Sequence, residues 1–211
     1  MKISVTKEDL ASGLQAVQNI VGARSTLPIL SNVLLVAGAK RLELRATDLE
    51  VSVHATVSAE VEREGATSMP AKRLFGLVRE IEAGEIKIEV SDKEVATVQA
   101  SASKYKLNGI GADEYPQQAK FKESGKVKVP QAKFKEMIRK TGYAVSTDES
   151  RHVLNGINIV ITPDRLTLVA TDGRRLALVE EEIEGGIKGE FIVPNKAVSE
   201  LQRLLQSSGD V

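Results

Sequence analysis

The chain opens with an alternation of apolar and polar residues that gives way to a helical pattern. Ile3 and Val5 recur at the two-residue period of a strand with one buried face. Apolar residues then recur at spacings of three and four, which predicts an amphipathic helix. They are Leu10, Leu14, Val17 and Val21. Thr6 or Ser4 is placed to cap the start of this helix.

Further strands and one more helix are predicted after this first helix. The strand patterns cover residues 27–36, 41–46 and 51–57, and a second helix over 71–82 follows Pro70. Strand patterns return over 85–90, 94–100 and 105–110.

The same pattern then repeats at a constant offset of 124 residues, with no insertion between Ile3/Val127 and Lys72/Lys196. The second copy predicts a strand at Val127 and Val129, a helix after Pro130, strands over 153–161, 165–170 and 175–179, and a helix over 195–205. Identical residues at this offset include the pairs Leu30/Leu154, Leu42/Leu166, Leu44/Leu168, Asp48/Asp172 and Pro70/Pro194. One domain design is therefore used in tandem.

This order of elements predicts an α+β fold, in which each copy packs two helices on one face of an antiparallel sheet. We expect a complete first domain over 1–122 and a second domain over 123–211. Because two full copies would exceed 211 residues, the second should lack its last strands. It should then expose a sheet edge and the apolar surface of Leu201 and Leu204.

The composition removes several classes of chemistry. The chain has no cysteine and two histidines, His54 and His152, so disulfides, thiolate metal sites and cysteine nucleophiles are excluded. We expect no metal and no cofactor. No apolar run approaches the roughly 18 residues of a membrane span, so we expect a cytoplasmic protein that does not enter membranes.

Charge is balanced over the chain, with 29 basic and 29 acidic residues, but it is uneven among the elements. The four predicted helices carry ten Lys and Arg against six Asp and Glu. From the residues alone, solvated helices and a surface for an anionic partner explain this excess equally well.

Several segments together resemble the bacterial sliding clamp family, the beta subunit of DNA polymerase III, over the whole chain. They are residues 22–30 (GARSTLPIL), 46–50 (ATDLE), 154–156 (LNG) and 170–177 (ATDGRRLA). The resemblance implies two protomers of three domains each, closed head to tail as a homodimeric ring around duplex DNA, with helices lining the hole. It also implies a non-catalytic processivity subunit that tethers the replicative polymerase, and it leaves the third domain outside this chain.

The resemblance assigns contacts with the phosphate backbone of double-stranded DNA, without base readout. The residues that match are Arg24, Arg73, Arg79, Lys72, Arg151 and Lys196. Asn195 stands where relatives often carry a basic residue, and Asp148 near Arg151 makes that loop less attractive to phosphate.

A second implied site is a cleft for short linear peptides of the DNA polymerase III alpha subunit, the clamp loader and repair proteins. The matching residues are Leu154, Thr171, Gly173, Arg174, Arg175 and Leu176. Without the resemblance, Leu154 and Leu176 would be interpreted as core residues of strands. Val153 replaces a frequent aromatic residue and Arg174 a frequent histidine, and the third domain would supply the rest of the cleft.

The implied ring interface lies on the last strands of the first copy. Tyr105 and Leu107 match its apolar part, and Lys104 and Arg73 are their charged neighbours. We expect an exposed edge strand there that favours self-association.

Two other functions compete with a clamp. The repeated Asp48 and Asp172 could act as a carboxylate pair in an enzyme, but such pairs must lie within several ångströms, and these residues are better explained as caps of turns between strands. The other alternative is a truncated interaction module that binds peptides and cannot close a ring. For the 211-residue chain we expect no topological retention on nicked circular DNA.

Overall fold

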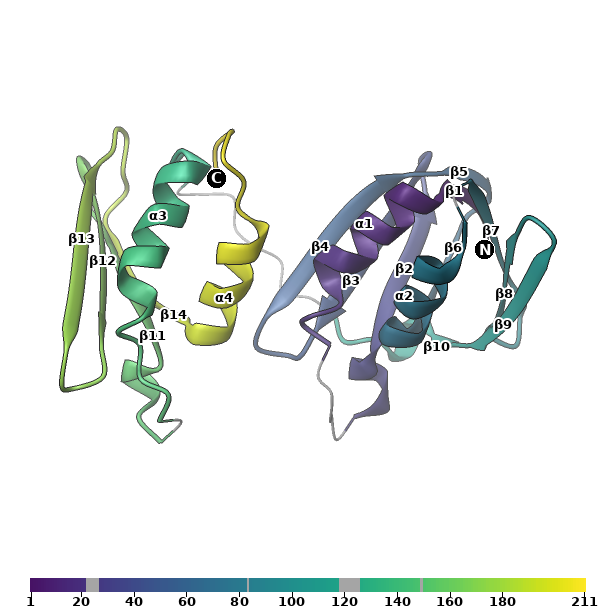
Figure 1. Ribbon diagram of the computed structural model, residues 1–211, viewed down its shortest axis with the longest axis horizontal. Coiled ribbons are helices and arrows are strands. Elements are labelled where there is room, and N and C mark those ends of the chain that lie inside the picture. Colours follow the sequence, from purple (N-terminus) through teal and green to yellow (C-terminus); the bar gives the residue numbers. More distant parts are fainter. Residues whose placement is uncertain (22–26, 83, 118–125, 149) are drawn as a thin grey trace. The chain divides into compact units, whose positions relative to one another are not determined.

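The computed structural model describes residues 1–21, 27–82, 84–117, 126–148 and 150–211. The chain forms two compact units, which we call unit 1 (Met1–Ala119) and unit 2 (Lys120–Val211) (Figure 1). The boundary predicted at residue 122 lies outside the described residues and stays a prediction. The two units are described separately.

The strands of unit 1 form two five-stranded sheets. One sheet has the order β5-β1-β7-β8-β9 and the other β10-β6-β2-β3-β4. The bounds of the first are β5 (Glu60–Arg63), β1 (Lys2–Thr6), β7 (Glu85–Val90), β8 (Val95–Ala100) and β9 (Ser103–Asn108). Those of the second are β10 (Ile110–Gly111), β6 (Gly65–Pro70), β2 (Asn32–Gly38), β3 (Arg41–Thr47) and β4 (Ser52–Ser58).

Both helices of unit 1 begin where the sequence places them. Helix α1 (Lys7–Val17) starts after Thr6, whose Oγ1 accepts a hydrogen bond from the backbone N–H of Asp9 at 3.1 Å. This confirms Thr6 as the cap. Helix α2 (Ala71–Glu80) follows Pro70 directly and ends two residues before the predicted position. Figure 1 shows α1 and α2 side by side over the sheet that contains β2 and β3.

Three features of unit 1 differ from the sequence prediction. The single expected sheet is two sheets, because β4 and β5 continue one another and carry the chain across from one sheet to the other. Strands β5 and β6 were not predicted. The stretch 27–36 begins as a 3₁₀-helix, η1 (Pro28–Ser31), because Pro28 fixes φ near its helical value and has no N–H for a ladder. A second 3₁₀-helix, η2 (Ala112–Glu114), follows β10.

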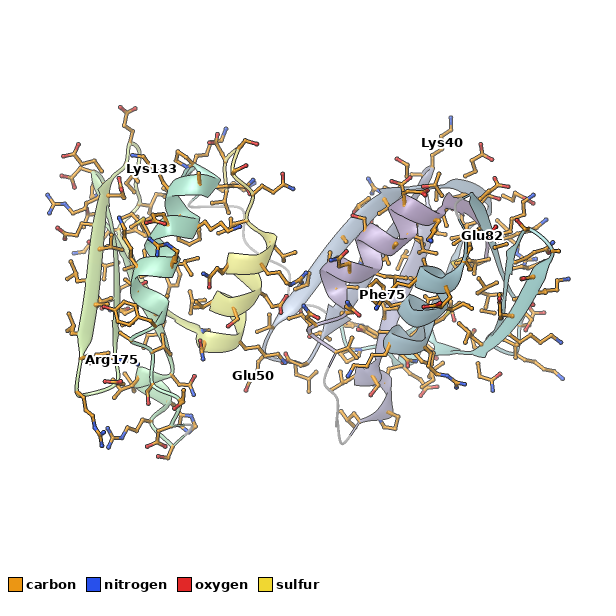
Figure 2. All side chains as sticks on the ribbon, in the orientation of Figure 1. Lys40, Glu50, Phe75, Glu82, Lys133 and Arg175 are labelled. Carbon is orange, nitrogen blue, oxygen red and sulfur yellow. The ribbon has the colours of Figure 1, made fainter. Side chains whose placement is uncertain are left out.

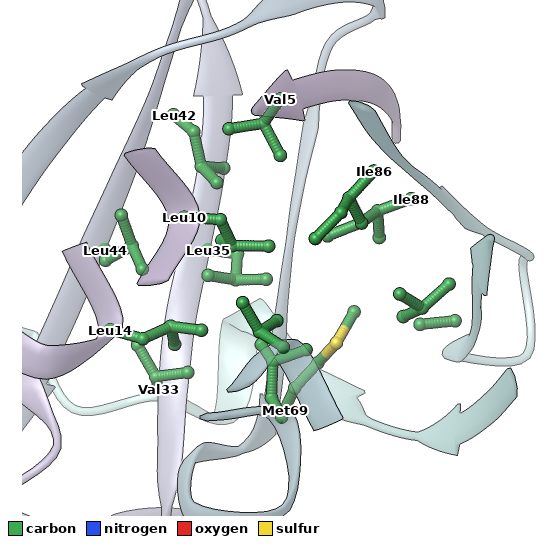
Figure 3. Packing of buried hydrophobic residues seen from close by; sticks show 14 of the residues in the cluster. Val5, Leu10, Leu14, Val33, Leu35, Leu42, Leu44, Met69, Ile86 and Ile88 are labelled. Carbon is green, nitrogen blue, oxygen red and sulfur yellow. The ribbon is translucent and has the colours of Figure 1, made fainter. Parts of the chain in front are cut away.

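The core of unit 1 lies between its helices and both sheets. Leu10 and Leu14 from α1 pack with Leu35 and Leu44 from the second sheet, and all four are fully buried. Ile86 and Ile88 of β7 point into the same core from the first sheet (Figure 3). The first sheet therefore closes a core that the helices and the second sheet leave open on one side.

Unit 2 contains one four-stranded sheet of order β13-β12-β11-β14. Its strands are β11 (Gly156–Ile161), β12 (Arg165–Thr171), β13 (Leu176–Glu182) and β14 (Gly189–Pro194). Helices α3 (Gln131–Gly142) and α4 (Asn195–Leu204) pack together against this sheet, and η3 (His152–Leu154) precedes β11. Strand β14 was not predicted. The α+β fold with two helices against antiparallel sheet is confirmed in both units.

The strand predicted at Val127 and Val129 is wrong. Residues 126–129 form no strand, although Val129 exchanges two backbone hydrogen bonds with Val211, at 2.9 and 2.8 Å. In unit 1 the equivalent β1 pairs with β5 on one side and β7 on the other. The described residues of unit 2 contain no complete counterpart of β5 or β7. The pairing of Val129 with Val211 therefore does not extend into a strand.

The predicted exposure of unit 2 is partly right. Leu204 is 37% exposed, whereas Leu201 packs against the core of Val129, Met137, Ile159 and Leu166. None of the helices in the described ranges is long and apolar enough to cross a membrane.

Candidate functional site

The repeated Thr-Asp pair builds the same turn in both units. In unit 2, Thr171 Oγ1 accepts a hydrogen bond from the N–H of Gly173 at 3.1 Å and donates one to the carbonyl of Arg175 at 2.7 Å. Asp172 Oδ1 accepts the N–H groups of Arg174 and Arg175, both at 3.0 Å. These two backbone hydrogen bonds are the main reason why the pKa of Asp172 is lowered.

The turn of unit 1 repeats these bonds with Thr47 and Asp48. Thr47 Oγ1 accepts the N–H of Leu49 at 3.0 Å, and Asp48 Oδ1 accepts the N–H of Val51 at 2.7 Å. The interpretation of both aspartates as turn caps is confirmed. Each carboxylate stabilises its own loop, which is a structural role.

In unit 2 this turn and the loop before η3 enclose a polar pocket, which we call the arginine pocket. Its volume is about 510 Å³, and its charged lining residues are Asp148, Arg151, Asp172, Arg174 and Arg175. Arg151 Nε lies 3.4 Å from Asp148 Oδ2, and Arg175 Nε lies 3.0 Å from Asp172 Oδ2. The pKa of Asp148 is lowered, chiefly by hydrogen bonds from the Ser150 side chain and backbone. The pocket carries three guanidinium groups against two carboxylates.

Arg175 is held in place from two sides. Arg175, which is labelled in Figure 2, forms an ion pair with Asp172. Its guanidinium also lies 5.5 Å from the ring centre of Tyr143, the residue that caps the end of α3. A side chain fixed by two contacts loses little conformational freedom when a ligand binds.

An apolar pocket of about 600 Å³ lies on the sheet of unit 2 next to these loops. It contains Val153 and Leu154 from η3 and Thr171 from the end of β12. Its other lining residues are Gly156, Asn158, Val169, Ala170, Glu190, Phe191 and Ile192. Several apolar side chains here are unusually exposed, with Val153 at 73% and Ile192 at 42%.

The equivalent face of unit 1 is covered. Tyr115 is 5% exposed, and its hydroxyl donates to the carbonyls of Asn32 and Arg45, which correspond to Gly156 and Val169 in the apolar pocket of unit 2. Burial raises the pKa of Tyr115 to about 12. Among the described residues of unit 2 none takes the position of Tyr115, and the pocket is open on this face.

The structure divides the predicted cleft residues between the two pockets. Leu154 and Thr171 line the apolar pocket, while Gly173, Arg174 and Arg175 line the arginine pocket together with Arg151. Leu176 lines neither pocket but is 63% exposed, so its alternative interpretation as a core residue is wrong. The residues that sequence reasoning missed, Val169, Glu190, Phe191 and Ile192, lie on β12 and β14. The run Phe191-Ile192-Val193 before Pro194 was the available signal for β14.

The basic residues predicted to contact DNA lie mainly on helices. Lys72, Arg73 and Arg79 are exposed on α2, and the guanidinium of Arg79 lies 5.9 Å from the ring centre of Phe75. Within their observed bounds the four helices carry ten basic and five acidic side chains. Lys196 is exposed in the first turn of α4. Arg151 lies in the arginine pocket, and Arg24 lies outside the described residues.

The predicted ring-interface residues occupy the edge of the first sheet in unit 1. Strand β9 pairs only with β8 among the described strands of that sheet, so the predicted edge is present. Tyr105 is 40% exposed, and Lys104 beside it is exposed as well. Leu107 is only 9% exposed and packs in the core, so the expectation of its exposure is wrong.

No cluster of three or more His, Cys, Asp or Glu is placed to hold a metal ion in the described part of the chain.

Two family profiles match nearly the whole sequence. The profile described as DNA polymerase III beta subunit, N-terminal domain, matches residues 1–119, and the profile of its central domain matches residues 128–211.

The curated relatives and solved structures that resemble this chain are sliding clamps. The beta sliding clamp of Chlamydia trachomatis serovar D is 33% identical over 213 residues, which cover 100% of this chain and 51% of the relative. That of Proteus mirabilis is 36% identical and is covered to 58% of its length. The DnaN sliding clamp (DNA polymerase III subunit beta) from Bartonella birtlesii, solved bound to griselimycin, has a TM-score of 0.94 and 35% identity, and the match covers 100% of this chain and 58% of that one. The DNA polymerase sliding clamp from Caulobacter crescentus gives 0.94 and 34%, with 100% and 59% covered. The chain thus spans a little over half the length of these proteins.

Proposed function

The chain belongs to the DNA polymerase III beta subunit family, and on that premise we propose that it is part of a sliding clamp that tethers the replicative polymerase to duplex DNA. Its role is non-catalytic and cytoplasmic. Its partners are double-stranded DNA, the polymerase III alpha subunit and the clamp loader. The observation that carries the proposal is the exposed apolar pocket of unit 2 beside an arginine-lined loop.

The two neighbouring pockets suit a short peptide. The apolar pocket accepts one or two apolar anchor side chains, and the arginine pocket supplies a charged rim beside it. Leu154 and Thr171 contact the anchor, while Gly173, Arg174, Arg175 and Leu176 border the peptide.

The DNA contact is electrostatic. Exposed Lys72, Arg73 and Arg79 on α2, with Lys196 on α4, present positive charge without base-reading geometry. Arg24 and Arg151 complete the set, with Arg151 the weakest because Asp148 already neutralises it. Such contacts bind any sequence and permit sliding.

Ring closure requires a larger part of the full-length protein than peptide binding or DNA contact does. Tyr105, Lys104 and Arg73 border the protomer interface, and Leu107 supports it from the core. The domain boundary near residue 122 separates two of the three clamp domains. The competing function, a peptide-binding module without ring closure, uses unit 2 alone and is favoured by its exposed pocket.

Loading assays separate these two functions. The 211-residue chain is incubated with clamp loader, ATP and nicked circular DNA, and the DNA is then linearised. Retention on the circle followed by release on linearisation would establish ring closure. For these 211 residues we expect peptide binding without retention on the circle. That result would mean that ring closure requires more of the clamp than these residues.

Leu154→Ala should weaken binding at the apolar pocket by about tenfold, because a well-buried anchor contact contributes on the order of 1.4 kcal/mol. Griselimycin, which the Bartonella birtlesii relative holds, serves as the probe in isothermal titration calorimetry. Ile187→Ala is the matched control, since Ile187 is 49% exposed and lines neither pocket. If both variants lost the same amount of affinity, Leu154 would not be part of the binding site.

Lys72→Ala and Arg73→Ala should each weaken binding to a duplex and reduce the slope of log K against log salt by about 0.9, one phosphate contact apiece. The measurement is fluorescence anisotropy over a salt series. Lys93→Ala, an exposed cation in the turn between β7 and β8, is the control and should leave the slope unchanged. The same slope in all variants would refute the role of α2.

A further inference from the structure

The arginine pocket of unit 2 contains one guanidinium group more than its two carboxylates neutralise. Arg151 pairs with Asp148 at 3.4 Å, and Arg175 pairs with Asp172 at 3.0 Å. The third arginine, Arg174, is exposed and forms no ion pair or side-chain hydrogen bond in the described part of the chain. The pocket therefore carries an excess of positive charge that is located on Arg174.

The turn that carries Arg174 does not depend on the side chain of this residue. The backbone N–H of Arg174, and not its guanidinium, donates to Asp172 at 3.0 Å. The counterpart bond in unit 1 runs from the N–H of Glu50 to Asp48 at 3.1 Å, so the same turn forms with an acidic residue at this position. The guanidinium of Arg174 therefore has no structural role in the turn and is available to a ligand.

The position of Arg174 also stays uncovered in the unit whose later strands are described. In unit 1 its counterpart Glu50 is exposed and the neighbouring Leu49 is 62% exposed. Strands β5 to β10 all follow that turn in the chain. Strands that follow the turn within a unit therefore leave this position in contact with solvent.

Arg174 is close enough to the apolar pocket for one peptide to contact both. Thr171 lines the apolar pocket and precedes Arg174 by three residues, which span at most about 10 Å. The loop before η3 approaches the same turn, because Arg151 Nη1 lies 3.4 Å from the position that a Cβ atom on Gly173 would take. An extended peptide advances about 3.3 Å per residue, so about three residues separate a side chain in the apolar pocket from one at Arg174.

We propose that Arg174 binds a side-chain carboxylate of the peptide ligand, so that the site selects peptides with an acidic residue within about three positions of the apolar anchor. This inference rests on the proposed function, because it requires a peptide anchored in the apolar pocket. A guanidinium offers two parallel N–H groups to a carboxylate, and such charge-assisted hydrogen bonds are stronger than neutral ones. Arg151 and Arg175 already have carboxylate partners, which leaves Arg174 as the arginine that discriminates between peptides.

The probe is a set of synthetic peptides with acetylated and amidated ends, a pair of leucines as the anchor and serine at most other positions. A single variable residue, placed two positions before or two positions after the leucines, is aspartate, asparagine or lysine. Binding to the 211-residue chain is measured by fluorescence anisotropy. In one of the two placements the aspartate peptide should bind about fivefold more tightly than the asparagine peptide, the size expected of one solvent-exposed ion pair. This preference should shrink as salt is added.

Arg174→Glu should reverse the preference, so that the lysine peptide binds more tightly than the aspartate peptide. The variant keeps the backbone N–H that donates to Asp172, so the turn is retained. Lys188→Glu is the matched control, because it changes the net charge equally at an exposed residue outside both pockets, and it should keep the preference for aspartate.

Two results would overturn this inference and leave the proposed peptide site in place. One is equal affinity for the aspartate and asparagine peptides in both placements. The other is a preference for aspartate that Arg174→Glu leaves unchanged. If none of the peptides bound, the proposed peptide site would fail and this inference with it.

A DNA phosphate is the competing ligand for Arg174. In that case Arg174→Glu would reduce the slope of log K against log salt for duplex binding, as expected for the α2 variants, and the peptides would show no dependence on charge. That combination would also overturn the proposal.

Discussion

Units 1 and 2 share one pattern of apolar residues, but equivalent apolar faces are buried in unit 1 and open in the described part of unit 2. Leu35 and Ile159 occupy the same position of equivalent strands, yet Leu35 lies under β7 and β8, while Ile159 lines an apolar groove of about 230 Å³ between the sheet and both helices of unit 2. The outer face of the sheet differs in the same way, because Tyr115 seals it in unit 1 and a pocket of about 600 Å³ opens on it in unit 2. Apolar hollows in the described part of unit 2 thus lie on faces that are covered in unit 1.

The Thr-Asp turn differs between the units in its neighbouring residues and not in its structure. Its hydrogen bonds are the same in both units, but the residues around it differ in charge. Asp48 is followed by Leu49 and Glu50, whereas Asp172 is followed by Gly173, Arg174 and Arg175. The conserved geometry of the turn lets unit 2 present two arginines at the rim of a pocket without any change of fold.

The largest expected difference between the units concerns their cores. Leu35→Ala should destabilise unit 1 by about 3 kcal/mol, since it leaves a cavity inside a closed core. Ile159→Ala should cost unit 2 about half as much, because the space it leaves joins a groove that is already open. Hydrogen exchange in a denaturant series measures each unit separately. Equal losses would mean that the groove is as well covered as the core of unit 1.

This difference also marks how far the sequence could predict the fold. Periodicity located both helices of each unit, and the constant offset carried these assignments to the second copy. It failed for Val127 and Val129, because a strand needs a partner and periodicity does not report whether one is present. Strands β5 and β6 were missed because they contain too few apolar residues to show an alternation, and β14 because its apolar residues are consecutive.

For the candidate site, the resemblance located both loops, but their grouping into two pockets required the structure. Arg151 is separated from Arg174 by 23 positions in sequence and joins it in one pocket. Leu107 shows the opposite error: it lies two residues after Tyr105, on the same face of β9, and was expected to be exposed with it, yet Leu107 is only 9% exposed and packs in the core.

Substitutions at one position of the turn should change the stability of the two units by smaller amounts and in opposite directions. Leu49 has φ of 80° and Gly173 has φ of 87°, both in the left-handed region that favours glycine. Leu49→Gly should therefore stabilise unit 1 by about 0.5 kcal/mol, while Gly173→Ala should destabilise unit 2 by about 1 kcal/mol. Denaturant unfolding followed by unit-resolved hydrogen exchange checks both values. Two changes of the same sign would contradict the equivalence of the turns.

The smallest effect is expected in the pKa of Asp172. Its titration distinguishes the contribution of the hydrogen bonds within the turn from that of the arginine side chains, which only the turn of unit 2 carries. Backbone N–H groups of Arg174 and Arg175 are the leading cause of its lowered pKa, and the side chain of Arg175 is a lesser one. A carboxyl whose pKa is lowered in the folded state contributes stability above its unfolded pKa of about 3.9, and this contribution is lost as the pH falls through the folded pKa. The amide signals of Arg174 and Arg175 should therefore titrate below pH 3.9, and in Asp172→Asn this step should vanish. Arg175→Ala should raise the pKa only slightly, because the N–H of residue 175 remains. If that variant restored the ordinary pKa, the added guanidinium and not the shared turn would hold the loop, and the two turns would be alike in shape only.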